Sequence, residues 1–386
     1  MLEIPTLLTG HASFDPAGDF EAFLRSLPAR WVVYLFCDAD NKPIQLLCVK
    51  NLRASLKRRL GGDEQIGPSR RVNYRDVVRH VHWQRVDSAF EADWLYFEVA
   101  RQIFPSTYQG MIGFRPAWFI HVNPENNFPR YIKTTDLGRP GLYVGPIEDK
   151  HAAARLIQLV EDSFDLCRYY NVLVEAPHGK ACAYKEMGKC PAPCDGSISM
   201  DQYREMIQSS ADALLDPAEA VRQNTRRMQQ AAAELRFEAA AKIKARVEQL
   251  AQLGKGPFRH ARLLRDFQYL SLQQGPRAGA AKMFLITPGR IEAMSCLIGE
   301  PSSTSEVLRM ALVEAATKEP DVDQAGAERI GIVAHHLFSP KAKQGVFLRL
   351  NEVDEKSLLK GYRELSRRPV EEQTETEGVM KELQSL

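Results

Sequence analysis

The chain has 386 residues, of which 44% are hydrophobic and 26% are charged, and its 51 lysines and arginines nearly balance its 49 aspartates and glutamates. This composition is typical of a folded protein with two or three domains and excludes wholesale disorder. Because the formal net charge is only +2, any nucleic-acid binding must come from local basic patches and not from a global positive field. No apolar run approaches the roughly 20 residues that span a bilayer, and the start lacks the features of a signal peptide. We therefore expect a cytoplasmic protein without a membrane partner.

The first 115 residues divide into an N-terminal extension, residues 1–29, and a small α/β domain, residues 30–115. The extension holds turn-forming residues and one short amphipathic stretch, residues 20–27, which predicts a docking helix. The domain begins with two apolar runs separated by turn chemistry, a pattern typical of a β-hairpin. Its expected elements are a hairpin (31–37 and 43–49), a basic helix that begins after the N-cap candidate Asn51, a strand (77–86) and a helix (89–104).

Beyond residue 115 the pattern changes from strands to helices and back. Two strand-like pieces, 117–122 and 130–134, precede a stretch with glycine and proline, 141–146, that predicts a turn. The expected fold class is α/β, with small sheets and flanking helices at both ends and an α-helical stretch between them. The expected divisions are a cysteine-cluster domain (116–199), a helical region (200–253) that restarts at Asp216 and Pro217, a C-terminal α/β domain (258–368) and an acidic flexible tail (369–386).

Four of the seven cysteines lie close together in the sequence. Cys167, Cys182, Cys190 and Cys194 form the pattern C-x14-C-x7-C-x3-C. Four thiolates are a ligand set for tetrahedral zinc or for an iron–sulfur cluster. The spacing argues against zinc, because structural zinc sites usually have paired C-x2-4-C knuckles. The residues alone leave open an iron–sulfur cluster, a zinc site and four unrelated buried thiols.

This region resembles the UvrC family, the incision subunits of bacterial nucleotide excision repair. The family's cysteine quartet ends in a motif like C-x7-C-x-x-P-C-x-G, and a second family motif similar to G-R-Y-F-G-P is echoed by residues 141–146. The residues that match the first motif are Cys182, Cys190, Pro193, Cys194 and Gly196. The resemblance implies a 4Fe-4S cluster held by the quartet, with zinc as the alternative.

A second resemblance, to the UVR motif of the same family, covers residues 228–243. The motif runs roughly M-x2-A-A-x2-L-x-F-E-x-A-A-x-I, and its small alanines let two helices approach closely. The matching residues are Met228, Ala231, Ala232, Leu235, Phe237, Glu238, Ala240, Ala241 and Ile243. Two such helices bury little area alone, so we expect a partner hairpin. The resemblance implies a UvrB-like protein, self-association through a second copy is another option, and the alternative is an ordinary hairpin packed within the chain.

The resemblance also implies that residues 30–115 form a GIY-YIG nuclease domain. Such a domain uses a tyrosine to activate water, an arginine to hold phosphate and a glutamate to bind a divalent metal. Tyr34 and Glu98 fall on the family's tyrosine and glutamate. Gln45 and Ser55 replace the family's second tyrosine and its arginine, and Cys48 stands where lysine is common. We therefore expect a degenerate site in which Tyr34 and Glu98 are remnants of the catalytic set. The alternative is that Tyr34 is an ordinary core residue and Glu98 a solvated helix carboxylate. Only an active site would need Mg²⁺ or Mn²⁺.

Basic residues cluster after the expected hairpin. They either contact DNA phosphates or form a solvated face. The candidates for DNA contact are Arg53, Lys57, Arg58, Arg59, Arg70 and Arg71. Near the other end, His335 and His336 have no acidic cluster at metal-ligand spacing, so we expect a structural or surface role for them.

These observations favour a UvrC-like protein of nucleotide excision repair, a DNA- and partner-binding accessory protein whose GIY-YIG domain is inactive or impaired. The first alternative is a divergent metal-dependent endonuclease that makes a single incision with a UvrB-like partner. The second is a UVR-mediated protein adaptor without a DNA role. The chain is too short for the family's RNase-H-like nuclease and helix-hairpin-helix modules together, so we expect it to lack the second nuclease.

Overall fold

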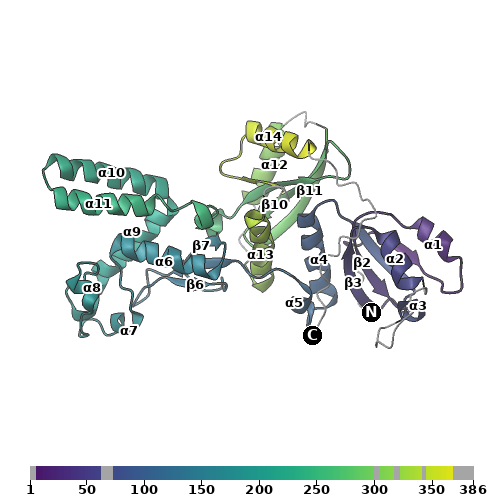
Figure 1. The fold of residues 1–386 in the computed structure, drawn as a ribbon, viewed down its shortest axis with the longest axis horizontal. Coiled ribbons are helices and arrows are strands. Elements are labelled where there is room, and N and C mark those ends of the chain that lie inside the picture. Colours follow the sequence, from purple (N-terminus) through teal and green to yellow (C-terminus); the bar gives the residue numbers. More distant parts are fainter. Residues whose placement is uncertain (1–5, 62–72, 300–303, 317–321, 341–344, 368–386) are drawn as a thin grey trace.

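The computed structural model describes residues 6–61, 73–299, 304–316, 322–340 and 345–367. Within these ranges the chain forms three four-stranded sheets, which follow one another along the long axis of the molecule (Figure 1). Every strand pairing in them is antiparallel. Arg70, Arg71 and the expected acidic tail lie outside the described residues. No helix in the described ranges is long and apolar enough to cross a membrane.

The N-terminal sheet has the strand order β1-β4-β2-β3. The predicted hairpin is present, because β2 pairs with β3 from Val32 opposite Val49 to Cys37 opposite Pro43. The sequence analysis places residues 10–13 in the extension, whereas here they form edge strand β1 and pair with β4. The bounds are β1 (Gly10–Ser13), β2 (Val32–Cys37), β3 (Pro43–Val49), β4 (His80–Arg85), α1 (Phe20–Ser26), α2 (Leu52–Leu60), α3 (Tyr74–Val77), α4 (Ala89–Ile103) and α5 (Tyr108–Met111).

Two helices cover opposite faces of this sheet, because every residue of β2 is buried and side chains alternate between faces along a strand. Tyr34 and Phe36 pack into one core with the apolar face of α2. Val33 and Leu35 pack into a second core with α4. The helices begin where capping chemistry allows: the Asn51 side chain accepts a hydrogen bond from the Ala54 N–H at 3.1 Å, as the sequence predicts.

The middle sheet has the order β6-β5-β7-β8, and its central strand β7 corrects the turn predicted over 141–146. Gly145 is required by packing, because a Cβ there would lie 2.4 Å from an atom of the Phe119 ring. Glycine and proline are thus signals of a close strand contact at this position, and not of a turn. The bounds are β5 (Trp118–Val122), β6 (Ile132–Thr134), β7 (Leu142–Ile147), β8 (Arg262–Leu263) and α6 (Lys150–Phe164).

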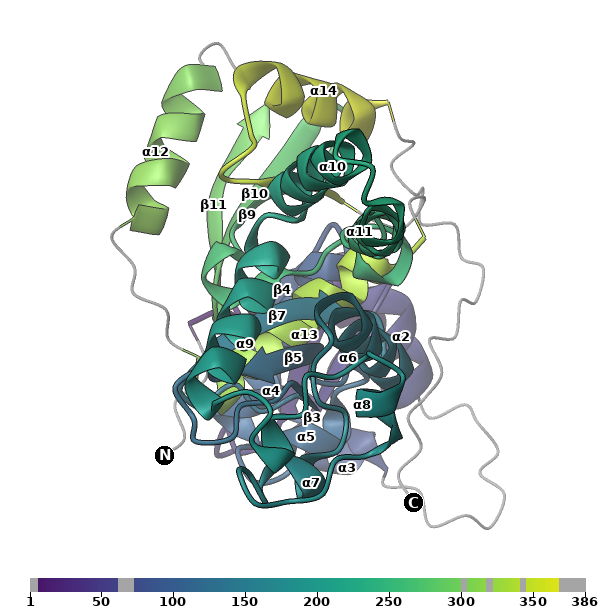
Figure 2. The same ribbon diagram turned by 90° about the vertical axis from the view of Figure 1, so that its left-hand side faces the viewer.

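Helices fill the segment between β7 and β8. The predicted restart is present, with Asp216 capping α10 and Pro217 at its first position. Helices α10 and α11 project from the body as a hairpin and lie side by side (Figures 1 and 2). The bounds are α7 (Tyr170–Leu173), α8 (Ala183–Glu186), η1 (Pro193–Asp195), α9 (Met200–Leu215), α10 (Pro217–Ala233), α11 (Phe237–Leu250) and η2 (Gly256–Phe258).

The C-terminal sheet has the order β11-β10-β9-β12 and is covered on both faces. One face packs against α12 and α14. The other packs with α13 into the same core as α4, so the N-terminal and C-terminal sheets share one apolar interior. The bounds are η3 (Leu264–Asp266), β9 (Tyr269–Gln274), β10 (Ala280–Thr287), β11 (Arg290–Ile298), α12 (Thr304–Ala316), α13 (Gln324–Phe338), β12 (Val346–Arg349) and α14 (Glu355–Ser366).

Candidate functional site

Tyr34 and Ser55 meet inside the core between the N-terminal sheet and α2. Tyr34 is 0% exposed and Ser55 6% exposed, and their hydroxyl oxygens are 3.1 Å apart. Burial raises the pKa of Tyr34 to about 12, against the opposing influence of Arg59. The phenol is therefore neutral at pH 7 and closed off from solvent, so its surroundings are those of a core tyrosine with a satisfied hydroxyl.

The two other replaced positions lie on β3, beside the same hairpin. Gln45 stands opposite Phe36, and its side-chain oxygen is buried without a hydrogen-bond donor among the described residues. The Cys48 thiol accepts a hydrogen bond from the Trp31 indole N–H at 3.3 Å. Burial raises the pKa of Cys48 to about 11. Neither residue presents a reactive group at the surface.

Glu98 lies on α4 and is held by an arginine from the other end of the chain. Its side chain is 9% exposed, so it is buried and not solvated. Arg329 of α13 donates from Nε to Oε1 at 2.6 Å and from Nη2 to Oε2 at 3.1 Å. Arg101 lies 3.5 Å from the same Oε2. This two-pronged geometry is the strongest arrangement of guanidinium and carboxylate, and it engages both oxygens that a metal ion would need.

The structure does not bring Tyr34 and Glu98 together. Tyr34 belongs to the core on the α2 face of the sheet. Glu98 lies on α4, whose buried residues belong to the core on the opposite face. Tyr34 instead contacts Ser55, and Glu98 contacts Arg329. No local sequence signal identifies Arg329 as a partner of Glu98, because the two residues are 231 positions apart.

More polar contacts join α4 and its surroundings to the C-terminal elements. Lys282 lies 2.7 Å from Asp87 and 2.5 Å from Glu91, which are the residues around the start of α4. His336 is 4% exposed and its Nε2 lies 2.9 Å from the Asp93 carboxylate, so its role is structural, as the sequence predicts. These contacts are partly or fully buried, which makes each of them costly to leave unpaired.

The candidate DNA-binding residues of α2 divide into two groups. Arg53 donates to the Leu27 carbonyl at 2.8 Å, and the Arg59 guanidinium lies 5.8 Å from the Tyr74 ring centroid, so both support the fold. Lys57, 3.9 Å from Glu21, and Arg58 point to solvent. A nearby arginine, Arg75, donates to the carbonyls of Leu60 and Pro16. Little unpaired positive charge therefore faces outward along α2.

The cysteine quartet lies between α6 and α9. Cys167, Cys190 and Cys194 are buried, whereas Cys182 is partly exposed at the start of α8. A hydrogen bond from Cys167 favours the thiolate of Cys190 and lowers its pKa, while it raises the pKa of Cys167. Within the described part of the chain, no group of three or more His, Cys, Asp or Glu side chains is placed to hold a metal ion. The quartet is thus a set of free, neighbouring thiols in a soft-ligand composition, but not an assembled ligand shell.

The UVR-like residues occupy the α10/α11 hairpin. Leu235, in the left-handed conformation with φ 59°, makes the turn between the helices. Leu235 is 73% exposed and Phe237 65% exposed, which is unusual for large apolar side chains. Glu238 is exposed, and Met228 and Ile243 are half-buried. The tip of the hairpin is therefore an unpartnered apolar surface with a charged neighbour.

Comparison with known proteins finds similarity over part of the chain. Residues 117–213 match the family model described as UvrC/Cho excinuclease, middle domain. The chain is 24% identical over 276 residues to the UvrABC system protein C of Clostridium perfringens strain SM101, covering 71% of this chain and 44% of the relative. It is 27% identical over 233 residues to that of Caldanaerobacter subterraneus, covering 58% of this chain and 37% of the relative.

A third relative, the UvrABC system protein C of Clostridium botulinum strain Hall, is 29% identical over 183 residues, which are 45% of this chain and 28% of the relative. The chain thus spans less than half the length of these curated relatives. No solved structure matches it.

Proposed function

Because this chain is a member of the UvrC-type family, we propose that it is an accessory protein of nucleotide excision repair that associates with DNA and with a partner protein and does not cut DNA through its N-terminal domain. The N-terminal sheet with α2 and α4 is, in this proposal, a GIY-YIG-like domain that has become a scaffold. The order of its elements, a hairpin, a helix, a strand and a second helix, supports that assignment.

One observation carries the proposal: Arg329 occupies both oxygens of Glu98. Hard divalent cations bind proteins through carboxylate oxygens, so a metal ion at Glu98 has to displace a buried, doubly hydrogen-bonded guanidinium. Tyr34 is closed off on the other face of the sheet, and Ser55 supplies no positive charge for a phosphate. The three tasks of a GIY-YIG site therefore have no common place in which to be performed.

A plasmid-nicking assay with Mg²⁺ or Mn²⁺ tests the scaffold assignment. We expect wild-type protein and Glu98→Gln to be equally inactive, while the wild-type protein binds DNA in a salt-dependent manner. Metal-dependent nicking by the wild type that is lost in Glu98→Gln would refute the proposal. Arg101→Ala is the matched control, since it removes a weaker neighbour of the same carboxylate.

The α10/α11 hairpin supports the partner-binding part of the proposal. Leu235 and Phe237 gain a dry environment only if another surface covers them. A UvrB-like hairpin and a second copy of this chain are the two occupants to compare. Light scattering of the purified chain measures self-association, and titration with a purified UvrB-like protein measures binding to that partner. Loss of binding in a Phe237→Ser variant identifies the hairpin as the contact.

We also propose the cysteine quartet as the site of a 4Fe-4S cluster, with zinc as the alternative. Its soft thiol composition supports this, although no group of three among the described side chains is placed to hold a metal ion. A bound cluster would supply four strong bonds that fix the segment from Cys167 to Cys194. Anaerobic purification with a visible absorption spectrum and metal analysis separates iron, zinc and neither.

A further inference from the structure

A cavity of about 320 Å³ opens at one end of the middle sheet and has no role in the arguments above. Its walls come from the end of β5, the two loops that flank β6 and the start of α7. The side chains that matter for its chemistry are His121, Asn123, Phe128, Arg130, Arg139 and Tyr170. Cationic, aromatic and amide groups therefore converge on one hollow, which is the pattern of a site for a charged and planar ligand.

Arg130 and Tyr170 form a stacked platform on one side of the cavity. The guanidinium carbon of Arg130 lies 3.8 Å from the centroid of the Tyr170 ring. Tyr170 is 39% exposed and Arg130 is also exposed. Among the described residues, no acidic side chain lies within ion-pair distance of Arg130. A flat, positively charged surface open to solvent suits the face of a nucleobase and the charge of its phosphate.

Arg139 provides a second cation in the lining of the cavity. Its Nε lies 3.3 Å from the Asp136 carboxylate, which leaves the two terminal nitrogens of the guanidinium to donate elsewhere. Its backbone is held in place, because the Tyr143 hydroxyl accepts from the Arg139 N–H at 2.7 Å and donates to its carbonyl at 2.9 Å. The backbone that carries the cation is thus fixed before a ligand arrives, which lowers the entropy lost on binding.

The loop between β5 and β6 is fixed as well. Arg204 of α9 donates to the carbonyls of Asn126 and Asn127 at 3.1 and 3.2 Å. Below the loop, His121 is 6% exposed and its Nε2 lies 3.0 Å from the Pro140 carbonyl. Burial lowers the pKa of His121, so the ring is neutral at pH 7 and offers Nδ1 as a hydrogen-bond acceptor. The lining of the cavity therefore combines fixed polar groups with cationic and aromatic side chains.

Aromatic and basic side chains continue beyond the cavity toward α8. The Tyr169 and Tyr184 rings lie 5.8 Å apart, and the Arg168 guanidinium lies 4.3 Å from the Tyr184 ring centroid. Tyr169 is 47% exposed. Arg168 is itself paired with Asp162 and only 12% exposed, and Tyr184 is half-buried, so of these side chains Tyr169 is the one available to stack on a further base.

We infer that this cavity binds one unpaired nucleotide of a DNA strand, with the base on the Arg130–Tyr170 platform and the adjacent phosphate at Arg139. A base inside a duplex is already stacked and cannot reach the platform, so the site selects single-stranded or unpaired DNA. The inference deepens the DNA association proposed above and rests on it. It moves the principal DNA contact from α2 to the middle sheet.

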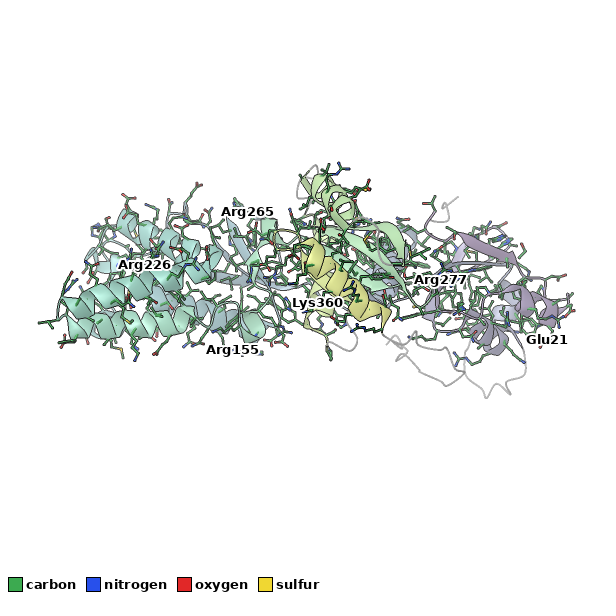
Figure 3. All side chains as sticks on the ribbon, turned by 90° about the horizontal axis from the view of Figure 1, so that it is seen from above. Glu21, Arg155, Arg226, Arg265, Arg277 and Lys360 are labelled. Carbon is green, nitrogen blue, oxygen red and sulfur yellow. The ribbon has the colours of Figure 1, made fainter. Side chains whose placement is uncertain are left out.

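Titration of a fluorescent oligo(dT) of about 12 nucleotides, and of a blunt duplex of the same length, tests the inference. We expect Tyr170→Leu to weaken oligo(dT) binding about tenfold and Tyr170→Phe to leave it unchanged, because stacking needs a ring and not a hydroxyl. Arg130→Ala should weaken binding and lower the salt dependence by about one phosphate contact. Arg155→Ala, an exposed arginine on α6 outside the cavity (Figure 3), is the matched charge control and should leave oligo(dT) binding within about twofold.

The outcomes separate the inference from the proposed function. If Tyr170→Leu and Arg130→Ala both bind oligo(dT) with wild-type affinity, the cavity is not the nucleotide site, while the proposed DNA association is unaffected. Equal losses on oligo(dT) and duplex overturn the selection for unpaired DNA. A wild-type protein that binds neither probe overturns the cavity and the DNA role together. Circular dichroism and the Tyr170→Phe variant, which keeps the ring, show whether any loss reflects misfolding.

Discussion

Arg329 and Glu98 should be strongly coupled, although they are 231 positions apart in the chain. Replacing Arg329 by Met keeps most of the aliphatic stem but leaves the Glu98 carboxylate, 9% exposed, without its main partner. Removing one member of a buried ion pair costs about 3 to 5 kcal/mol. Because Arg101 remains 3.5 Å from the carboxylate and Arg329 itself is 18% exposed, we expect the lower value, about 3 kcal/mol.

The double variant Glu98→Gln/Arg329→Met should be less destabilised than the two single variants predict together. The double variant contains neither Glu98 nor Arg329, so neither charge is left buried without the other. Arg329 also donates to the Gly289 carbonyl at 3.2 Å; this bond is lost in the single and the double Arg329→Met variants alike, so a double-mutant cycle cancels its contribution. We expect a coupling energy of about 2 kcal/mol.

Hydrogen exchange of the amides in α4 and α13 measures this locally, which matters because a chain with several sheets need not unfold in one step. A loss of 3 kcal/mol corresponds to roughly a hundredfold faster exchange. The exposed pair Lys42 and Asp40, 3.6 Å apart, is the control and should show no measurable coupling. Additive effects of Glu98→Gln and Arg329→Met, within about 0.5 kcal/mol, would refute the assignment of the pair as a buried clamp.

Three further outcomes follow from the structure. Leu235→Ser and Phe237→Ser should change the free energy of unfolding by less than about 0.5 kcal/mol, since both side chains are exposed. The same variants should abolish association with a partner in light scattering or pull-down. A loss of stability would instead place both side chains in the core. Tyr34→Phe should cost about 1 kcal/mol in denaturant titration, because it leaves the buried Ser55 hydroxyl without its partner; no change would mean that the hydroxyls do not bond. Burial, aided by His11 and His80, lowers the pKa of His82 to about 4. The unfolded chain therefore binds the proton more readily, and stability should fall as pH drops from about 6.5 toward 4, by about 2 kcal/mol at pH 5. Hydrogen exchange of β4 should show this fall, and His82→Gln should remove it.

Local chemistry made several elements predictable. The hairpin of β2 and β3, the Asn51 cap of α2 and the Asp216–Pro217 start of α10 depend on residues within a few positions of one another. Such signals act through turn geometry and unpaired backbone groups at helix ends, which a sequence displays directly.

The features that escaped prediction depend on contacts between distant segments. Strand β1 has little apolar content and gains its place by pairing with β4. Strand β7 is marked by Gly145 and Pro146, which suggest a turn until the Phe119 ring is seen against the glycine. Glu98 has an acidic side chain on a helix, a pattern that predicts solvation, and only the fold reveals Arg329 opposite it. The cavity at Tyr170 likewise draws its walls from four separate segments.

The shared interior of the N-terminal and C-terminal sheets also affects how the chain is made. Asp93 and His336 are 243 residues apart, and the apolar residues Phe90 and Trp94 of the same helix pack against Phe284. At a synthesis rate of about 5 to 20 residues per second, the ribosome needs about 10 to 50 seconds after making α4 to synthesise the C-terminal residues that pack against these rings. During that interval α4 exposes its apolar side to solvent. A lower growth temperature, or a chaperone that shields α4, should therefore raise the yield of soluble chain.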